Sequence, residues 1–209
     1  ATLGSGSSVS FDGIDDEADV PDNADFSFGD GTSDQPFSIV AWVNQTATVA
    51  LKTILSKWDD TGNTSEWMLE LDASEKLSCK LYDESASAYI GRLYNTALAT
   101  GSFINVAMTY DGSRAATGIR LYSAAVRVDD TAQSDSTYTA MENKAGTVKL
   151  GVKSTDTDIF SGSMACPGSI TTAWSLPRVA TSRSTAADSS RVPARNLMPV
   201  VMSRMVRGL

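Results

Sequence analysis

Histidine is absent from this chain of 209 residues, and its absence limits the chemistry that the protein can perform. A Ser-His-Asp or Cys-His arrangement within one chain, a histidine general base and a histidine-ligated metal are all excluded. Any catalysis would depend on carboxylates, lysine, tyrosine or serine. The sequence also lacks G-x-x-x-x-G-K-[ST] and a G-x-G-x-x-G placed between a strand and a helix, so nucleotide binding has no support.

Cysteines are few, and long apolar runs are missing. Cys79 and Cys166 are too few for a disulfide framework in a chain of this length, and we interpret both as buried thiols. Cys79 lies between Leu77 and Leu81 at a spacing of two, which predicts that all three face the core. No apolar run approaches the about 18–20 residues that span a bilayer, so we expect no membrane partner. The N-terminus has no features of a secretory signal, so such a signal is either absent or already removed. Ala1 also fits a cytoplasmically made protein that has lost an initiator methionine, which is the interpretation we favour.

Helical periodicity is almost absent, whereas strand and turn signals recur along the whole chain. Residues 36–44 carry apolar side chains on both faces of an alternating pattern, which predicts a central strand. Residues 66–72 and 76–83 flank a short polar segment, which predicts a hairpin. A short helix or turn has support only after Ser175. The spacing of the strands predicts an all-β fold of two antiparallel sheets.

The charge of the chain changes sign near its end. Residues 1–176 carry 11 Lys and Arg against 24 Asp and Glu, whereas residues 177–209 carry six Arg and one acidic residue. We therefore divide the chain into a sandwich domain, residues 1–176, and a basic, apolar C-terminal arm, residues 177–209. The acidic body repels phosphate and the six arginines form no dense patch, so we expect no nucleic-acid partner.

The C-terminal arm alternates arginines with apolar side chains, and Pro193 and Pro199 oppose a continuous helix. Chain ends are often frayed, but burial of each Met or Val side chain yields about 1.5–3 kcal/mol. We expect the arm to pack on the body or on a neighbouring subunit, either a second copy or a capsid protein. The predicted docking residues are Arg191, Arg195, Leu197, Met198, Met202, Arg204, Met205 and Arg207.

Eight segments occur in an order that is more specific than any one of them: SVSFDGIDDEADVPDN, PFSIVAWVN, ILSKWD, WMLELDASEKLSCKLYD, INVAMTYDGS, GIRLYSAAVRV, VKLGV and IFSGSM. In this order the chain resembles the laminin G-like, concanavalin A-like lectin/glucanase superfamily in its bacterial and phage form, and the resemblance extends over roughly residues 7–176. The resemblance implies an antiparallel two-sheet jelly-roll sandwich of about a dozen strands. It also implies a frequent calcium site and a sugar-binding face.

The resemblance makes calcium a candidate cofactor, although one position departs from the family pattern. The last strand of the family reads F-x-G-x-I-D-x-V, and here Ala165 stands where the acid is found. Asp12, Asp15 and Asp16 remain as candidate oxygen ligands for calcium, which takes six to eight of them. The alternative interpretation is a solvated acidic turn between strands.

The predicted strand at residues 66–72 carries two acidic residues that could in principle act in catalysis. Glucanases of this superfamily carry E-x-D-x-E on a strand, and Glu66 and Glu70 have the outer spacing of that motif. Met68 replaces the middle acid, so the coupling that would tune the outer pair is missing. We expect a polar outward face and no enzymatic activity.

Stacking of sugars on aromatic side chains is a second possible activity, with Trp58, Tyr89 and Tyr94 as candidate ligand-binding residues. The sequence favours a non-enzymatic structural or binding protein. The first hypothesis is a capsid decoration or appendage protein at the virion surface, forming a homo-oligomer through its arm. The alternatives are a calcium-assisted carbohydrate-binding adhesion module at an extracellular or cell surface, and a degenerate β-glucanase.

Overall fold

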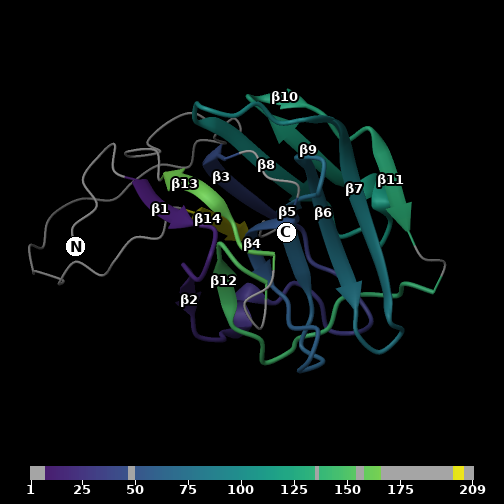
Figure 1. The fold of residues 1–209 in the computed structure, drawn as a ribbon. Coiled ribbons are helices and arrows are strands. Elements are labelled where there is room, and N and C mark those ends of the chain that lie inside the picture. Colours follow the sequence, from purple (N-terminus) through teal and green to yellow (C-terminus); the bar gives the residue numbers. More distant parts are fainter. Residues whose placement is uncertain (1–7, 47–49, 135–136, 154–157, 166–199, 205–209) are drawn as a thin grey trace, which may run out of the picture.

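The computed structural model describes residues 8–46, 50–134, 137–153, 158–165 and 200–204, the last segment by its backbone alone. These residues form two seven-stranded sheets that pack face to face (Figure 1). Every pairing between named strands is antiparallel. The predicted all-β, two-sheet sandwich is therefore confirmed.

The first sheet is organised around a strand with partners on both of its edges, as the two-sided apolar pattern of residues 36–44 predicts. In spatial order its strands are β1 (Ser8–Asp12), β13 (Ser161–Ala165), β3 (Phe37–Gln45), β8 (Ile104–Tyr110), β9 (Ile119–Ser123) and β10 (Val126–Arg127), and β14 (Val200–Arg204) also pairs with β3.

The second sheet contains the predicted hairpin as two of its central strands. In spatial order its strands are β11 (Thr131–Ser134), β7 (Ala88–Ala97), β6 (Lys76–Asp83), β5 (Trp67–Leu71), β4 (Lys52–Lys57), β12 (Val148–Leu150) and β2 (Ala18–Val20). The hairpin turn between β5 and β6 is closed by the Glu75 N–H, which donates to the Asp72 carbonyl at 2.9 Å.

One segment of the C-terminal arm joins the first sheet. Ala165, the last residue of β13, is opposite Trp42, and Val200, the first residue of β14, is opposite Ala41. β14 thus continues along the edge of β3 where β13 ends. The domain boundary at residue 176, the short helix after Ser175 and Cys166 lie outside the described residues. So do six of the predicted docking residues: Arg191, Arg195, Leu197, Met198, Met205 and Arg207.

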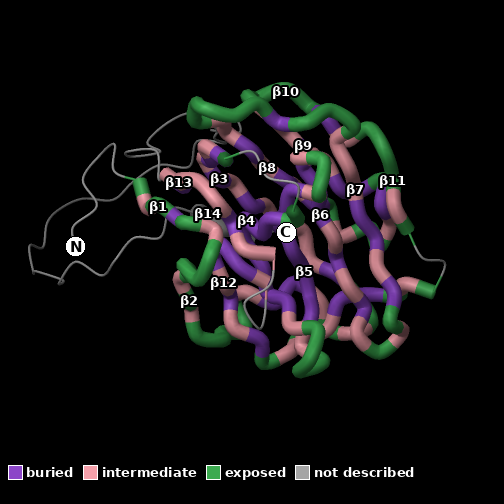
Figure 2. Tube along the Cα trace, in the orientation of Figure 1, coloured by how far each residue is buried: buried purple, intermediate pink, exposed green. Residues whose placement is uncertain are grey.

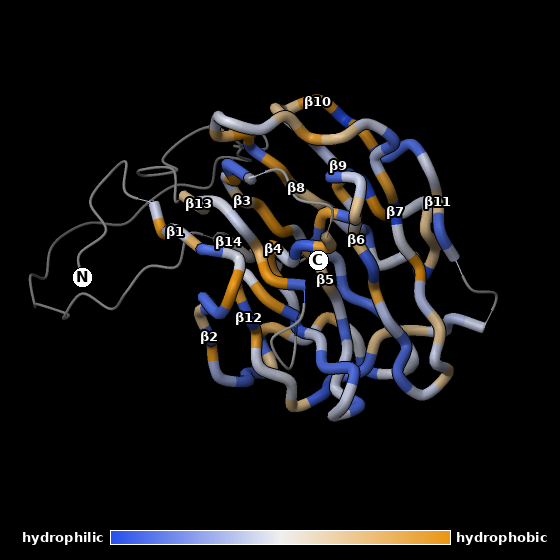
Figure 3. The backbone as a smooth tube through the Cα atoms, viewed as in Figure 1, coloured by the Kyte–Doolittle hydropathy of each residue, from blue (hydrophilic) through white to orange (hydrophobic). Residues whose placement is uncertain are grey.

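The core lies between the sheets and follows a period-two pattern along β3, whereas β4 and β5 are buried at every position. Alternate side chains of β3 are buried, and the Phe37 ring stacks on Phe28 with centroids 4.0 Å apart. The Trp67 ring of β5 lies 6.3 Å from the Phe37 ring across the sandwich. Cys79 is a free, buried thiol in the same core, as predicted. Most of the buried residues of the central strands are hydrophobic, and β4 also buries a lysine at each end (Figures 2 and 3).

Helical structure in the described residues is limited to two 3-10 turns, η1 (Ala24–Phe26) and η2 (Ala116–Gly118). Within that part of the chain, no helix has the length and apolar character needed to cross a membrane.

Two glycines with the same backbone conformation differ in the space around them and offer a test of the packing. Gly151 has φ +82° and Gly101 has φ +81°, so alanine is strained at both, by about 1–2 kcal/mol. A Cβ at Gly151 would also lie 2.5 Å from the Phe11 ring, whereas nothing lies within 4 Å at Gly101. We expect Gly151→Ala to lower the free energy of unfolding by about 1–3 kcal/mol more than Gly101→Ala, measured by urea denaturation. Equal losses would contradict the close contact between Gly151 and β1.

Candidate functional site

An open pocket of about 570 Å³ lies at the rim of the first sheet, where β1, β13 and β3 meet the segment before β8. Eight of its eleven lining residues have side chains that end in a hydroxyl, amide or carboxylate group. We refer to it as the rim pocket, and its lining residues are Ser10, Phe11, Asp12, Asn44, Gln45, Thr46, Thr100, Gly101, Ser161, Gly162 and Ser163.

Two features of the chain build the base of the rim pocket. Gly162 has φ +136°, and a Cβ there would lie 2.3 Å from the Asn44 carbonyl oxygen, so only glycine lets β13 approach β3 this closely. Gln45 is held from the interior, because its amide donates to the Leu98 carbonyl and its Oε1 accepts from Lys52 Nζ at 2.8 Å. Lys52 is fully buried and also forms an ion pair with Glu75.

The three predicted metal ligands come together beside the rim pocket. One carboxylate oxygen each from Asp12, Asp15 and Asp16 lies within 4.8 Å of the others, and all three residues are exposed. Asp12 Oδ1 accepts the backbone N–H of Ile14 at 2.8 Å, and Asp16 Oδ2 accepts that of Asp12 at 2.9 Å. These bonds shape the acidic turn, and each carboxylate keeps further lone pairs. We call this group the acidic trio.

The acidic trio fits the chemistry of calcium, which prefers hard oxygen ligands. It offers three carboxylates out of the six to eight oxygens that the ion takes, and Asp12 also lines the rim pocket. The family acid replaced by Ala165 does not belong to this group. Asp12 is opposite Ser161, and Ala165 lies four residues further along β13, about 13 Å away.

The predicted aromatic ligand-binding residues do not gather at the rim pocket. The Trp58 ring packs on Tyr82 with centroids 4.9 Å apart, and Tyr82 is opposite Tyr89 in the pairing of β6 with β7. Tyr94 packs instead against the core. Trp58 is buried, and its indole N–H donates to Asp60 at 2.6 Å. The structure thus brings Trp58 and Tyr89 to one region of the second sheet and leaves Tyr94 elsewhere.

The two acids with the glucanase spacing are both buried and paired with lysines. Glu70 is 3 % exposed and forms a 2.8 Å ion pair with Lys80. Glu66 is fully buried and forms a 2.7 Å ion pair with Lys57, which is also fully buried. Neither glutamate lines the rim pocket. The expected outward polar face is therefore corrected for these two acids, because each one is covered and neutralised by a lysine.

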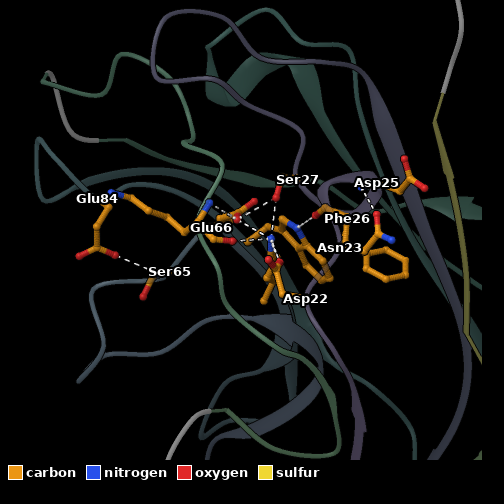
Figure 4. A network of polar contacts seen from close by, with 11 residues as sticks. Asp22, Asn23, Asp25, Phe26, Ser27, Ser65, Glu66 and Glu84 are labelled. Atoms are coloured by element: carbon orange, nitrogen blue, oxygen red, sulfur yellow. Dashed lines mark hydrogen bonds and ion pairs between the residues drawn. The ribbon is translucent and has the colours of Figure 1, made fainter.

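Lys57 is the centre of a polar network under η1, in which Asp22, Ser27 and Glu66 point toward one another (Figure 4). Its Nζ lies 2.9 Å from Asp22 Oδ1 and 2.5 Å from Ser27 Oγ. Glu66 Oε1 also accepts the backbone N–H of Lys144 at 2.8 Å, whereas its Oε2 is buried with no hydrogen-bond partner. Burial raises the pKa of Glu66 to about 6, against the lowering effect of Lys57.

Sequence reasoning missed Lys57, Lys52 and most of the rim pocket. A lysine in an apolar strand gave no signal that it would be buried, because long charged side chains are rarely buried unless they are paired. The pocket residues are common polar residues from four separate segments, and only the fold assembles them.

Comparisons with known proteins give a family and a fold. A protein-family model described as "Concanavalin A-like lectin/glucanases superfamily" matches residues 12–168. A search of curated proteins finds no match.

Two solved structures are similar over about three quarters of the chain. Domains LG4-5 of the mouse laminin alpha1 chain give a TM-score of 0.52 at 14 % identity, covering 76 % of this chain and 40 % of that one. The CBM40 of Ruminococcus gnavus IT-sialidase, bound to alpha2,3 sialyllactose, gives 0.51 at 15 % identity, covering 77 % and 89 %. At these identities the likeness concerns the fold.

The buried Glu66 carboxyl predicts a pH dependence of stability. The pKa of Glu66 in the folded state, about 6, lies above the ordinary value of 4.5. Protonation of Glu66 therefore adds to the free energy of unfolding. This contribution is fully present below pH 4.5 and is lost as the pH rises through 6. Glu66→Gln removes this titration and keeps the side-chain shape. Relative to that variant, we expect the wild type to gain about 2 kcal/mol of unfolding free energy between pH 7 and pH 4.5. Chemical denaturation at both pH values measures this difference, and a constant difference would contradict the assignment.

Proposed function

The chain belongs to the concanavalin A-like lectin/glucanases superfamily, and from this membership we propose that it is a non-catalytic domain that binds a glycan at the rim pocket. The observation that carries the proposal is the pocket itself. It is open, it holds about 570 Å³, and its wall presents hydroxyl, amide and carboxylate groups, which match the hydroxyl groups of a saccharide. The CBM40 of similar fold was solved bound to alpha2,3 sialyllactose, in keeping with a binding role.

The absence of catalysis is supported by the positions of Glu66 and Glu70. Retaining hydrolysis needs two carboxyl groups about 5–5.5 Å apart that both reach the substrate. Here each glutamate is covered and occupied by a lysine, and Met68 stands between them in the sequence. Neither one borders the rim pocket, so a glycan bound there would meet no acid pair of this kind.

Calcium assistance is part of the proposal, because the acidic trio adjoins the rim pocket through Asp12. A calcium ion held by the trio would complete its coordination shell with water or with hydroxyl groups of the glycan. Vicinal hydroxyl groups are hard oxygen ligands and suit this ion.

We expect glycan binding to depend on calcium and on the acidic trio. The experiment is a glycan array probed with calcium and with a chelator, using the wild type, Asp12→Asn and a control, Asp25→Asn, which changes an exposed acid on η1. Asparagine at position 12 keeps the acceptor for the Ile14 N–H and loses the charge. The wild type and the control should bind with calcium, and Asp12→Asn should bind at least about tenfold more weakly, a loss of about 1.4 kcal/mol. An array without hits in either condition would overturn the proposed function.

A second candidate function, assembly on a virion surface, is favoured by the division of charge along the chain. The body is strongly acidic, and the C-terminal arm holds six arginines and one aspartate. Complementary charges of this kind steer and align protein partners. In this proposal the arm joins the chain to a neighbouring copy or to a capsid protein.

Deleting residues 190–209 tests the arm. We expect loss of assembly, measured by light scattering after size exclusion, with a folded sandwich by circular dichroism. A shorter deletion of residues 205–209, which retains β14, is the matched control. A protein lacking residues 190–209 that still assembles like the full chain would refute this second function.

A further inference from the structure

The charged side chain among the described residues that line the rim pocket is acidic. Among the described residues that line it, Asp12 is charged and none is Lys or Arg. The chain segments that supply the lining and their flanks, residues 7–15, 41–49, 97–104 and 158–166, contain no basic residue in the sequence. Asp15 and Asp16 add two further carboxylates beside Asp12. A ligand in the pocket therefore meets negative charge and no neighbouring cation from these segments.

Lys52 contacts the wall of the pocket from the interior, but its side chain is not available to a ligand. Lys52 Nζ contacts Gln45 Oε1 and the Thr46 carbonyl, each at 2.8 Å, and both of these residues line the pocket. Its side chain is fully buried, and its charge is compensated by Glu75. The lysine supports the base of the pocket and offers no donor to an anion bound above it.

From this charge distribution we propose that the rim pocket selects electrically neutral glycans and rejects glycans that carry sialic acid, sulfate or uronic acid. The inference rests on the proposed function and names the class of ligand. Two like charges within about 6 Å at a protein surface repel strongly enough to change an affinity by about tenfold. Among the described residues that line the pocket, no arginine is present to make the bidentate contacts that usually compensate a carboxylate or sulfate.

A bound calcium ion does not reverse this preference. Three carboxylates carry three negative charges and the ion carries two positive charges, so one negative charge stays uncompensated at the rim. A neutral diol can complete the coordination shell of the ion without adding charge. The carboxylate of an acidic sugar is also an oxygen ligand, but it adds a further negative charge to a site that is already negative. We therefore expect the neutral member of a pair to be preferred when calcium is present, and the chelator to weaken the binding of both members.

Exposed apolar side chains around the same rim suit a neutral ligand. Ile14 lies two residues after Asp12 and is 72 % exposed. Phe103 lies two residues after the lining residue Gly101 and is 41 % exposed. Phe103 also lies beside Asn44, because the next residue, Ile104, is opposite Val43. Aromatic and aliphatic side chains contact the C–H faces of neutral sugars favourably. The rim thus combines polar groups in the pocket with apolar groups around it.

The test compares matched glycans, each printed as a neutral form and as its sialylated, sulfated or uronic counterpart, with and without calcium. We expect the neutral member of each bound pair to bind at least about tenfold more tightly, which corresponds to about 1.4 kcal/mol. Titration calorimetry on the best pair gives the ratio. Equal or tighter binding of the acidic member would overturn the inference and leave the proposed function intact, whereas binding of neither member would overturn the proposed function itself.

A reversal of charge provides the control. Asn44 lines the rim pocket, and Asn44→Lys adds a cation there, while Asn44→Gln keeps a neutral amide. We expect Asn44→Lys to bind the acidic member at least about tenfold more tightly than Asn44→Gln does. If the two variants show the same ratio of neutral to acidic binding, the charge of the pocket does not set its selectivity and the inference fails.

Discussion

The contact between β3 and β5 across the sandwich is the interaction on which the other features depend. Phe37, Phe28 and Trp67 form one aromatic group that holds the two sheets together. Side chains on a strand alternate between faces, so burial of Phe37 and the residues at a spacing of two fixes which residues of β3 face the core. The same register places Asn44, Gln45 and the beginning of β13 at the rim, where the pocket forms.

Two buried lysines close the apolar core near the two ends of β4. Lys52 pairs with Glu75 beside the rim pocket, and Lys57 pairs with Glu66 beneath η1. Removing one partner of a buried pair leaves an uncompensated charge, which is strongly destabilising. The Glu66 carboxylate, which has the spacing of a catalytic residue, therefore acts as a counterion within the fold. A glutamate with this spacing has a structural role here, because it is paired with Lys57 in the interior.

The packed core and the proposed binding site lie in different parts of the sandwich. The strand interiors supply the packed core, and the strand ends and the turns between them supply the polar rim pocket and the acidic trio. Membership in the superfamily accounts for the sheets and their order, but a shared fold does not determine the ligand. In the function proposed above, the charges and hydrogen-bonding groups of this particular rim select the ligand.

The sequence by itself determined the two-sheet fold, the central position of residues 36–44, the hairpin of β5 and β6 and the buried Cys79 thiol, because period-two alternation is a local property. It also placed Asp12, Asp15 and Asp16 together, since they share one turn. Only the tertiary structure decided that Glu66 meets Lys57, that Trp58 is covered, and that four distant segments form one pocket. The pocket joins segments far apart in the chain, and the partners of all these residues depend on strand order and register, which local patterns do not encode.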